Sequence, residues 1–282
     1  MPGLSTSQKI AIATLASRLV RGTRSLFGLP EKAIFTRGGI RWELDLKEGI
    51  DFAIWLFGHF EPDAYAAYKA RLQPGDVVLD IGANIGGHAL PLAQCVAPTG
   101  KVLAFEPTIY AFGKLNRHRE LNPELGKLIF ARQTLLMDSP AAAVPATIAS
   151  AWPLEAQEGL HPDHLGRMES TTGAQAATLD ELVADEPRID FIKLDVDGHE
   201  LAVLKGARAT LARCQPPILI ELCPQVCVEH GHTFADLVQE ITSAGYRFEA
   251  FNGRALPSDP AALEALIPEK GGLNVLALPA HP

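Results

Sequence analysis

The sequence predicts an α/β protein with a doubly wound, mostly parallel sheet of seven strands, preceded by a helix and a β-hairpin. Three observations predict this class. Short apolar runs recur along the chain, most are followed by a stretch whose apolar residues have helical spacing, and several end in a carboxylate. Strands that alternate with helices need crossover connections, which place helices on both faces of a parallel sheet.

The alternation runs from residue 77 to residue 244. The expected strands are residues 77–80, 101–105, 128–132, 190–195 and 217–221. One expected helix ends near residue 92, and three others span 111–121, 200–212 and 234–244. Two further strands are expected at 247–251 and 274–278. No long helical pattern separates them, so we expect an antiparallel edge pair joined by the proline-rich stretch 257–269.

The first 50 residues are expected to form an extension that precedes the main domain. Residues 5–28 have helical spacing and carry Lys9, Arg18, Arg21 and Arg24. Such a helix either docks on the body of the protein or makes a weak contact with a membrane surface. Two alternating runs around Gly38-Gly39 predict a hairpin over 33–45. We therefore divide the chain into an extension, 1–50, and a domain, 51–282.

Residues 139–177 interrupt the alternation between the third and fourth strands. The stretch is rich in Ala, Pro, Ser and Thr. A loop of this length in a compact domain is usually functional or disordered. A lid over the substrate and a flexible insertion of no special role are equally compatible with the sequence.

Composition limits the function classes. The 282 residues carry a formal charge of −8, with 47% hydrophobic and 21% charged residues, so no nucleic-acid partner is expected. Four cysteines are too few for a disulfide scaffold in a chain of this length. The sequence shows no secretory signal and no apolar run long enough to span a bilayer, so we expect a soluble, cytoplasmic protein.

The strongest motif is a glycine-rich loop between the first strand of the alternation and its helix. It reads Asp80-Ile-Gly82-Ala-Asn84-Ile-Gly86-Gly87. Glycine allows a sharp turn and close approach of a ligand to the main chain, and the N–H groups at the next helix start can bind an anion. Glu106 ends the second strand, where an acidic side chain can accept hydrogen bonds from both hydroxyls of a ribose.

Two missing features narrow the ligand. A dinucleotide fingerprint needs a glycine where this chain has Asn84, and a phosphate-binding loop needs Gly-Lys-Ser/Thr. The expected ligand therefore has a ribose and an anionic tail but no pyrophosphate. S-adenosyl-L-methionine fits this description, with S-adenosyl-L-homocysteine as its product. Its amino acid part would meet the loop and Asp80, and its ribose would meet Glu106.

The chain resembles the FkbM family of methyltransferases. The matching segments cover about residues 50–250: Gly58-His-Phe-Glu61-Pro, Pro74-Gly-Asp-Val-Val-Leu-Asp80-Ile-Gly-Ala-Asn-Ile-Gly86, Ala104-Phe-Glu106-Pro, Thr178-Leu-Asp180-Glu-Leu, Ile192-Lys-Leu-Asp195-Val-Asp-Gly198-His-Glu200, Val203-Leu-Lys-Gly206-Ala and Ile218-Leu-Ile-Glu221.

The resemblance implies a Rossmann-like methyltransferase fold and mainly O-methylation of glycans, lipids or natural products. It also implies cofactor contacts by Asp80, Gly82, Asn84, Gly86 and Glu106, and a segment around Glu61 that closes over the cofactor pocket. The chain departs from the family in having Asp197 where glutamate is usual and Cys223 near a position that is often histidine. Both departures concern the acceptor side of the expected site.

The catalytic candidates lie at the ends of the fourth and fifth strands. Asp195 and Glu221 end these strands, and ligands of open parallel sheets bind beyond the carboxyl ends of the strands. A hydroxyl acceptor must lose its proton, and Asp195, His199 or Glu221 is the candidate base. Histidine titrates nearest neutrality, whereas the family pattern favours Asp195. We expect Asp195 to be the base or acceptor anchor, with His199 assisting.

No metal site is predicted. The segment containing Cys223, Cys227, His230 and His232 lacks the ligand spacing of a zinc site. Asp195, Asp197 and Glu221 have the chemistry to hold a divalent cation such as magnesium, so metal dependence stays open.

The sequence leaves alternatives to an O-methyltransferase. A nicotinamide-dependent oxidoreductase shares the strand, loop, helix and ribose carboxylate, but Asn84 disfavours it. A nucleic-acid methyltransferase is disfavoured by the negative charge. A catalytically inactive module that binds S-adenosylmethionine is a further alternative. The acceptor (small molecule, glycan or lipid), the methylated atom (O or N) and the oligomeric state are not determined by the sequence.

Overall fold

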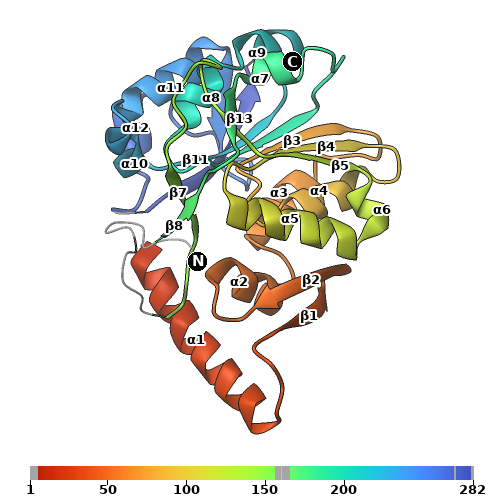
Figure 1. Ribbon diagram of the computed structural model, residues 1–282. Coiled ribbons are helices and arrows are strands. Elements are labelled where there is room, and N and C mark those ends of the chain that lie inside the picture. Colours follow the sequence, from red (N-terminus) through yellow and green to blue (C-terminus); the bar gives the residue numbers. More distant parts are fainter. Residues whose placement is uncertain (1–5, 156–159, 161–165, 270, 281–282) are drawn as a thin grey trace.

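The computed structural model describes residues 6–155, 160, 166–269 and 271–280. Its centre is a twisted sheet of seven strands covered by helices on both faces (Figure 1). The strand order is β12-β13-β11-β10-β3-β4-β5. The strands are β3 (Val77–Ile81), β4 (Lys101–Phe105), β5 (Ile129–Arg132), β10 (Phe191–Leu194), β11 (Ile218–Leu222), β12 (Tyr246–Glu249) and β13 (Leu273–Pro279).

This topology confirms the predicted doubly wound, seven-stranded, mostly parallel sheet. The strands β5, β4, β3, β10 and β11 pair in parallel, whereas β13 pairs antiparallel with both β11 and β12. The last two strands do form the expected antiparallel pair. However, β13 lies inside the sheet, between β11 and β12, so of these two strands only β12 lies at an edge. The proline-rich connection between them contains a short helix, α12 (Pro260–Glu264).

The strands are apolar on both sides because both faces are covered. In β3, Val78 faces one core and Leu79 faces the other, and Val102 and Leu103 of β4 divide in the same way. The helices α4 (Ala89–Val96) and α5 (Ile109–Leu121), with the short α6 (Pro123–Gly126), pack on the side of Val78. The helices α10 (Pro224–Glu229) and α11 (Phe234–Ser243) pack on the side of Leu79. Burial on both faces explains why these strands read as continuous apolar runs.

The expected helix over 200–212 is two helices, α8 (Glu200–Lys205) and α9 (Arg208–Cys214). A Cβ atom on Gly206 would lie 2.2 Å from the carbonyl oxygen of Met137, so the chain passes too close there for any other residue. The carboxylate of Asp180, in α7 (Leu179–Leu182), accepts hydrogen bonds from the N–H groups of Ala209 and Thr210 and starts the second helix. Periodicity alone does not reveal this break, because both helices keep the same apolar spacing.

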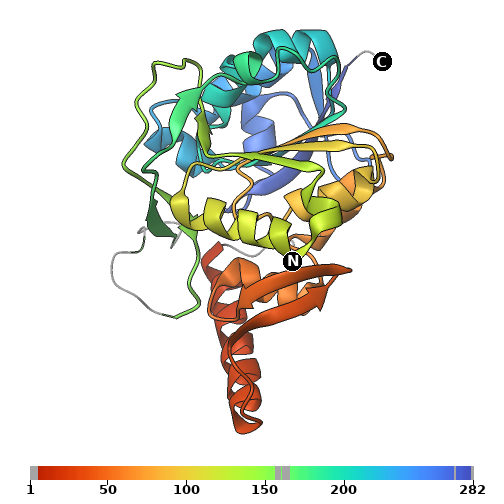
Figure 2. The ribbon, with the colours of Figure 1, turned by 45° about the vertical axis from the view of Figure 1, so that its right-hand side comes forward.

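The extension contains α1 (Thr6–Leu26), β1 (Lys32–Arg37) and β2 (Ile40–Asp45). Two helices, α2 (Gly49–Phe57) and α3 (Pro62–Lys69), then lead to the first strand of the sheet. The helix and hairpin agree with the sequence; residue 5 of the expected helix lies outside the described residues. Alternate residues of β2 are fully buried, and Trp42 packs edge-on against His118 of α5 with ring centroids 5.0 Å apart. The hairpin is thus joined to the domain through α5, as Figure 2 shows from the side.

The insertion 139–177 contains regular structure where the sequence suggested a loop. Strands β7 (Thr147–Ala151) and β8 (Arg167–Ser170) form an antiparallel ribbon, and β9 (Gln175–Ala177) pairs in parallel with β6 (Thr134–Leu136). Residues 156–159 and 161–165 of this stretch lie outside the described residues. Figures 1 and 2 show the ribbon running from the sheet towards α1. None of the helices in the described ranges combines the length and the apolarity needed to cross a bilayer.

Candidate active site

The site lies where the winding of the sheet reverses. The crossovers from β3 run through α4 and α5, whereas those from β10 run through α8, α9 and α11. Strands β3 and β10 are neighbours, with Asp80 opposite Lys193 and Ile81 opposite Leu194. The loops after these two strands diverge to opposite faces, and ligands of open parallel sheets bind at such a switch, beyond the carboxyl ends of the strands. Every strand-end residue that the sequence singled out lies at this edge or next to it.

The glycine loop after β3 is shaped by close packing on β10. Gly82 has a φ of +79°, and a Cβ atom there would lie 1.8 Å from the carbonyl oxygen of Asp195. Gly86 has a φ of +88°, and its Cβ would meet Leu115 at 2.7 Å. Asn84 also has a positive φ, +47°, a conformation that asparagine tolerates better than most residues. The two glycines are therefore required by the fold of the loop itself.

Glu106 joins the end of β4 to this loop. Its Oε2 accepts a hydrogen bond from the Asn84 N–H at 2.9 Å. Its Oε1 accepts bonds from the N–H and the hydroxyl of Thr108, at 2.9 and 2.6 Å. The side chain is buried, and this burial raises the pKa of Glu106, while the bonds from Thr108 and Asn84 act in the opposite direction. The expected partner of the glycine loop is thus in contact with it.

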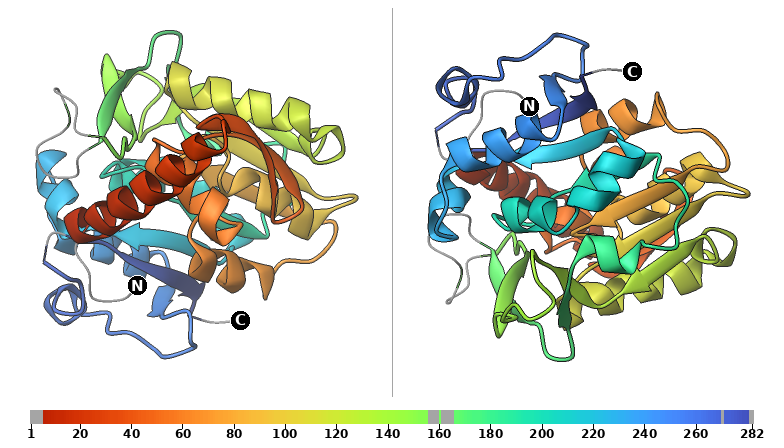
Figure 3. Two further views of the ribbon diagram at one scale, coloured as in Figure 1. Left: turned by 90° about the horizontal axis from the view of Figure 1, so that it is seen from below. Right: turned by 90° about the horizontal axis from the view of Figure 1, so that it is seen from above.

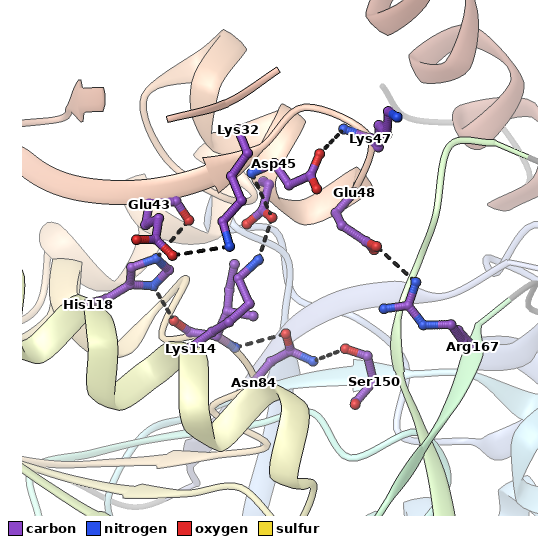
Figure 4. A network of polar contacts seen from close by, with 12 residues as sticks. Lys32, Glu43, Asp45, Lys47, Glu48, Asn84, Lys114, His118, Ser150 and Arg167 are labelled. Carbon is purple, nitrogen blue, oxygen red and sulfur yellow. Dashed lines mark hydrogen bonds and ion pairs between the residues drawn. The ribbon is translucent and has the colours of Figure 1, made fainter. Parts of the chain in front are cut away.

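The insertion contacts the same loop, which the sequence did not predict. The Asn84 side-chain amide donates to the Ser150 carbonyl at 2.8 Å, and the Ser150 hydroxyl lies 2.9 Å from that of Thr108. The Gly49 N–H donates to the carbonyl of Trp152, so the ribbon also holds the extension. Figure 4 shows Ser150 beside Asn84, with Lys114 and Arg167 nearby. The ribbon β7–β8 therefore forms a wall of the site.

A buried lysine lies among the carboxylates at the strand ends. Lys193 Nζ donates to Asp195 Oδ2 at 3.0 Å and to the Gly82 carbonyl at 3.4 Å. Desolvation lowers the pKa of Lys193, but Asp195, Asp80 and Glu61 outweigh that effect and raise it, so the lysine is charged. Asp80 is fully buried, and neither of its carboxylate oxygens has a hydrogen-bond partner among the described residues. Burial raises the pKa of Asp80, while the charge of Lys193 acts against that shift.

Glu61 reaches this cluster from the turn before α3. Its Oε1 accepts a bond from the Asn274 side-chain amide at 3.0 Å, and its Oε2 lies 3.3 Å from Nε2 of the buried His88. Desolvation raises the pKa of Glu61, but His88, Lys193 and Asn274 together lower it below its ordinary value. The Glu61 backbone is left-handed, with a φ of +47°. Glu61 therefore links the turn before α3 to His88 and to Asn274 of β13.

Glu221, at the end of β11, lies in the most carboxylate-rich part of the cluster. Desolvation, followed by the charges of Asp195 and Glu61, raises its pKa well above the ordinary value. Desolvation and Asp195 shift the pKa of Asp197 in the same direction. Glu221 therefore has a raised pKa among several carboxylates, whereas Asp195 has Lys193 as a direct cationic partner.

His199 lies on the other side of the turn that follows β10. Its ring centroid is 4.2 Å from that of His230 in the segment after α10. Burial, with His230 and His232 nearby, lowers the pKa of His199 to about 4. Glu200 accepts hydrogen bonds from the N–H groups of Val196 and Gly198, at 3.1 and 3.0 Å. Glu200 thus stabilises the turn, and the structure places His199 beside two other histidines and not in contact with Asp195.

The comparisons with known proteins agree with this geometry. The family described as "Methyltransferase FkbM domain" matches residues 80–248, which include the glycine loop, Glu106, the lysine–carboxylate cluster and Glu221. The match covers more than half of the chain. The chain belongs to the FkbM family of methyltransferases. The family resemblance inferred from the sequence motifs is therefore confirmed, and the family favours a methyltransferase over the nicotinamide-dependent oxidoreductase.

A curated relative of this FkbM family member is the hexuronic acid methyltransferase AglP of Haloferax volcanii. The two are 31% identical over 150 residues, which are 52% of this chain and 56% of the relative. The aligned part thus spans only about half the length of the curated protein.

Solved structures of similar fold include the methyltransferase FkbM of Methylobacillus flagellatus KT, at 17% identity and a TM-score of 0.44 over 82% of this chain and 54% of that one. Another is Aeropyrum pernix fibrillarin, whose structure contains S-adenosyl-L-methionine, at 15% identity and a TM-score of 0.43 over 88% and 82% of the two chains.

Within the described parts of the chain, no group of three or more His, Cys, Asp or Glu side chains is arranged to hold a metal ion. Cys223 and Cys227 lie around α10, and burial raises the pKa of both thiols to about 12, which keeps them protonated. His230 packs against His199 and not against the two sulfurs.

Sequence reasoning missed several residues of the site. The sequence contained a signal for Lys193, because a lysine inside an apolar strand is buried and needs a charged or polar partner. Ser150, Thr108, His88 and Asn274 had none, since each is brought to the site by packing between distant segments.

Proposed function

We propose that this FkbM family member is an S-adenosyl-L-methionine-dependent methyltransferase that methylates a hydroxyl group of a sugar. The observation that carries the proposal is the contact between Glu106 Oε2 and the N–H of Asn84, which joins the acid at the end of β4 to the glycine loop after β3. The family match supplies the reaction class.

The chemistry of the pocket fits S-adenosylmethionine. The site contains Glu61, Asp80, Asp195 and Glu221 around one lysine, and so favours a ligand that carries positive charge. The buried oxygens of Asp80 have no hydrogen-bond partner among the described residues, and such groups normally have one. S-adenosylmethionine carries a sulfonium and an ammonium group, and when bound it supplies an electrophilic methyl group.

Each of the expected cofactor residues has a role in this proposal. Glu106 accepts a hydrogen bond from one ribose hydroxyl with the lone pair of Oε2 that Asn84 leaves free. Gly82 and Gly86 shape the loop so that its main chain approaches the ligand, and Asn84 keeps the loop attached to the insertion through Ser150. Asp80 faces the ammonium side. Glu61 closes the pocket from α3, held in place by Asn274.

Asp195 is the proposed base. The bond from Lys193 fixes the orientation of its carboxylate, and the lysine is its direct cationic partner. Burial and neighbouring carboxylates raise the pKa of Glu221 well above its ordinary value, which favours its protonated form, so its proposed role is to donate a hydrogen bond to the acceptor and not to remove a proton. His199 has the neutral ring that a base needs, but it lies beside His230 and contributes at most to the wall of the acceptor pocket. Alignment of the hydroxyl with the methyl group supplies much of the rate.

A uronic acid residue in a glycan is the proposed acceptor, on the strength of the relative named a hexuronic acid methyltransferase. The division of the chain into the extension 1–50 and the domain 51–282 remains part of the proposal, with the extension and the insertion shaping the acceptor side. Contacts such as that between the Gly49 N–H and the Trp152 carbonyl link the two.

Calorimetry tests the cofactor assignment. S-adenosylhomocysteine should bind to the purified protein with one-to-one stoichiometry, whereas NAD⁺ and NADP⁺ should release no heat. Methyl transfer is then measured with labelled S-adenosylmethionine and glucuronic or galacturonic acid glycosides, with neutral hexose glycosides as the matched control. If neither S-adenosylmethionine nor its demethylated product binds, the proposal is wrong.

A further inference from the structure

The outward face of α1 is an apolar stripe. Leu15 and Leu19 are 64% and 66% exposed, and Ile12 lies one turn before them. Leu26, the last residue of the helix, and Phe27, which follows it, are 85% and 75% exposed. Large apolar side chains gathered on one face of a helix mark an interaction site more often than scattered single ones do. We call Ile12, Leu15, Leu19, Leu26 and Phe27 the α1 stripe.

The α1 stripe is not needed to hold the helix on the protein. The opposite face does this: Ile10, Ala13, Ala16 and Val20 pack on Leu46, Phe52 and Leu154, and the buried Ser17 hydroxyl donates to the Leu46 carbonyl at 2.6 Å. Figure 3, in the view from below, shows α1 running across the near side of the molecule. The stripe is therefore apolar surface beyond what folding uses.

The charge around the α1 stripe is positive. The first 30 residues contain four basic residues and no acidic residue, in a chain whose formal charge is −8. Arg18 is exposed between Leu15 and Leu19, and no described carboxylate pairs with it. Arg24 donates to the Pro30 carbonyl and lies over the Phe35 ring, so its charge is not neutralised, whereas Arg21 pairs with Glu31 and Glu155.

We propose that the α1 stripe docks on the surface of a bilayer that contains anionic lipids. An apolar helix face flanked by Arg and Lys is the pattern of helices that lie in the plane of a membrane interface. The apolar side chains enter the acyl boundary, and Arg18 meets the anionic headgroups. A second copy of the chain is a poorer partner, because a symmetric contact between two α1 stripes brings Arg18 against its own copy. This proposal does not depend on the methyltransferase assignment.

Co-sedimentation with vesicles tests the proposal without cofactor or acceptor. The full chain should bind vesicles of phosphatidylcholine mixed with phosphatidylglycerol, and bind much more weakly to phosphatidylcholine alone or in high salt. Arg18→Gln should weaken binding about fivefold, the loss expected for one basic residue at an anionic surface. The double variant Leu15→Ser/Leu19→Ser should weaken it by more than about tenfold.

The matched control is Val228→Ser, which removes another apolar side chain that is 72% exposed but lies on α10. It should bind anionic vesicles like the wild type. Circular dichroism melting curves check that every variant is folded. The proposal is overturned if the wild type does not bind the anionic vesicles or if the double variant binds them equally well. It is also overturned by another pair of results: sedimentation equilibrium shows that the wild type is a dimer and the double variant a monomer, and neither protein binds vesicles.

Discussion

Replacing Glu106 by glutamine tests the link between the acid at the end of β4 and the glycine loop. The carboxylate accepts three hydrogen bonds, from Asn84 N–H at Oε2 and from Thr108 N–H and hydroxyl at Oε1. Glutamine keeps the size of the side chain but has a single acceptor oxygen. If that oxygen stays with the two donors of Thr108, the amide NH₂ faces the N–H of Asn84, and two donors oppose each other.

The contacts of Glu106 predict two effects of Glu106→Gln, one on the free energy of folding and one on the affinity for the cofactor. An unpaired, buried Asn84 N–H costs about 1–3 kcal/mol of folding free energy. A protein of this size then melts about 2–4 °C lower for each kcal/mol lost. A lost hydrogen bond to a charged acceptor costs about 1.5–3 kcal/mol of binding, which raises the dissociation constant of S-adenosylmethionine about 10- to 150-fold.

Titration calorimetry with S-adenosylhomocysteine measures the affinity, and differential scanning fluorimetry measures the melting temperature. The matched control is Glu240→Gln, which removes a carboxylate that pairs with Arg208 on the surface, and it should change neither quantity appreciably. An unchanged dissociation constant in Glu106→Gln, with the control behaving as expected, would show that the ribose contact is wrongly assigned.

Three further predictions concern the lysine–carboxylate cluster and its neighbours. Asp195→Asn should retain cofactor affinity in calorimetry and lose methyl transfer; normal turnover would remove Asp195 from the mechanism. Lys193→Met should lower the free energy of unfolding in urea by about 3–5 kcal/mol, because it leaves buried carboxylates without their cation; wild-type stability would contradict this account. The pKa of His199 is lowered to about 4 in the folded protein, against about 6.5 in the unfolded chain. Between these two pH values the unfolded state binds one more proton, so the protein loses stability as the pH falls from 6.5 to 4. His199→Gln should remove up to about 3 kcal/mol of this pH dependence, and equal slopes for variant and wild type would refute the shift.

Much of the fold could be predicted because strand and helix patterns are local. The apolar runs that became β3, β4, β10 and β11 were recognisable because burial on both faces makes such strands continuous in apolar residues. The place of β13 was not predictable, since its insertion between β11 and β12 depends on pairing with distant partners. The break at Gly206 was missed for the same reason: it depends on the Met137 carbonyl.

The insertion 139–177 shows most directly what could not be predicted from the sequence. Its Ala-, Pro- and Ser-rich composition suggested a loop, yet β7 and β8 form a ribbon. Neighbour-dependent pairing outweighs the weak strand propensity of these residues. Through Ser150 the ribbon contacts both the glycine loop and Thr108, so a segment whose sequence carried no chemical signal borders the loop that the sequence singled out.

The sequence by itself determined the class of this protein: the order of strands and helices, the glycine loop, and the acids that end the strands, because each depends on residues close together in the chain. Only the tertiary structure decided the surroundings of those acids. Asp195 lies beside Lys193, whereas desolvation and neighbouring carboxylates raise the pKa of Glu221 well above its ordinary value. Charge state depends on desolvation and on neighbours brought together by folding, and neither is written in the local sequence.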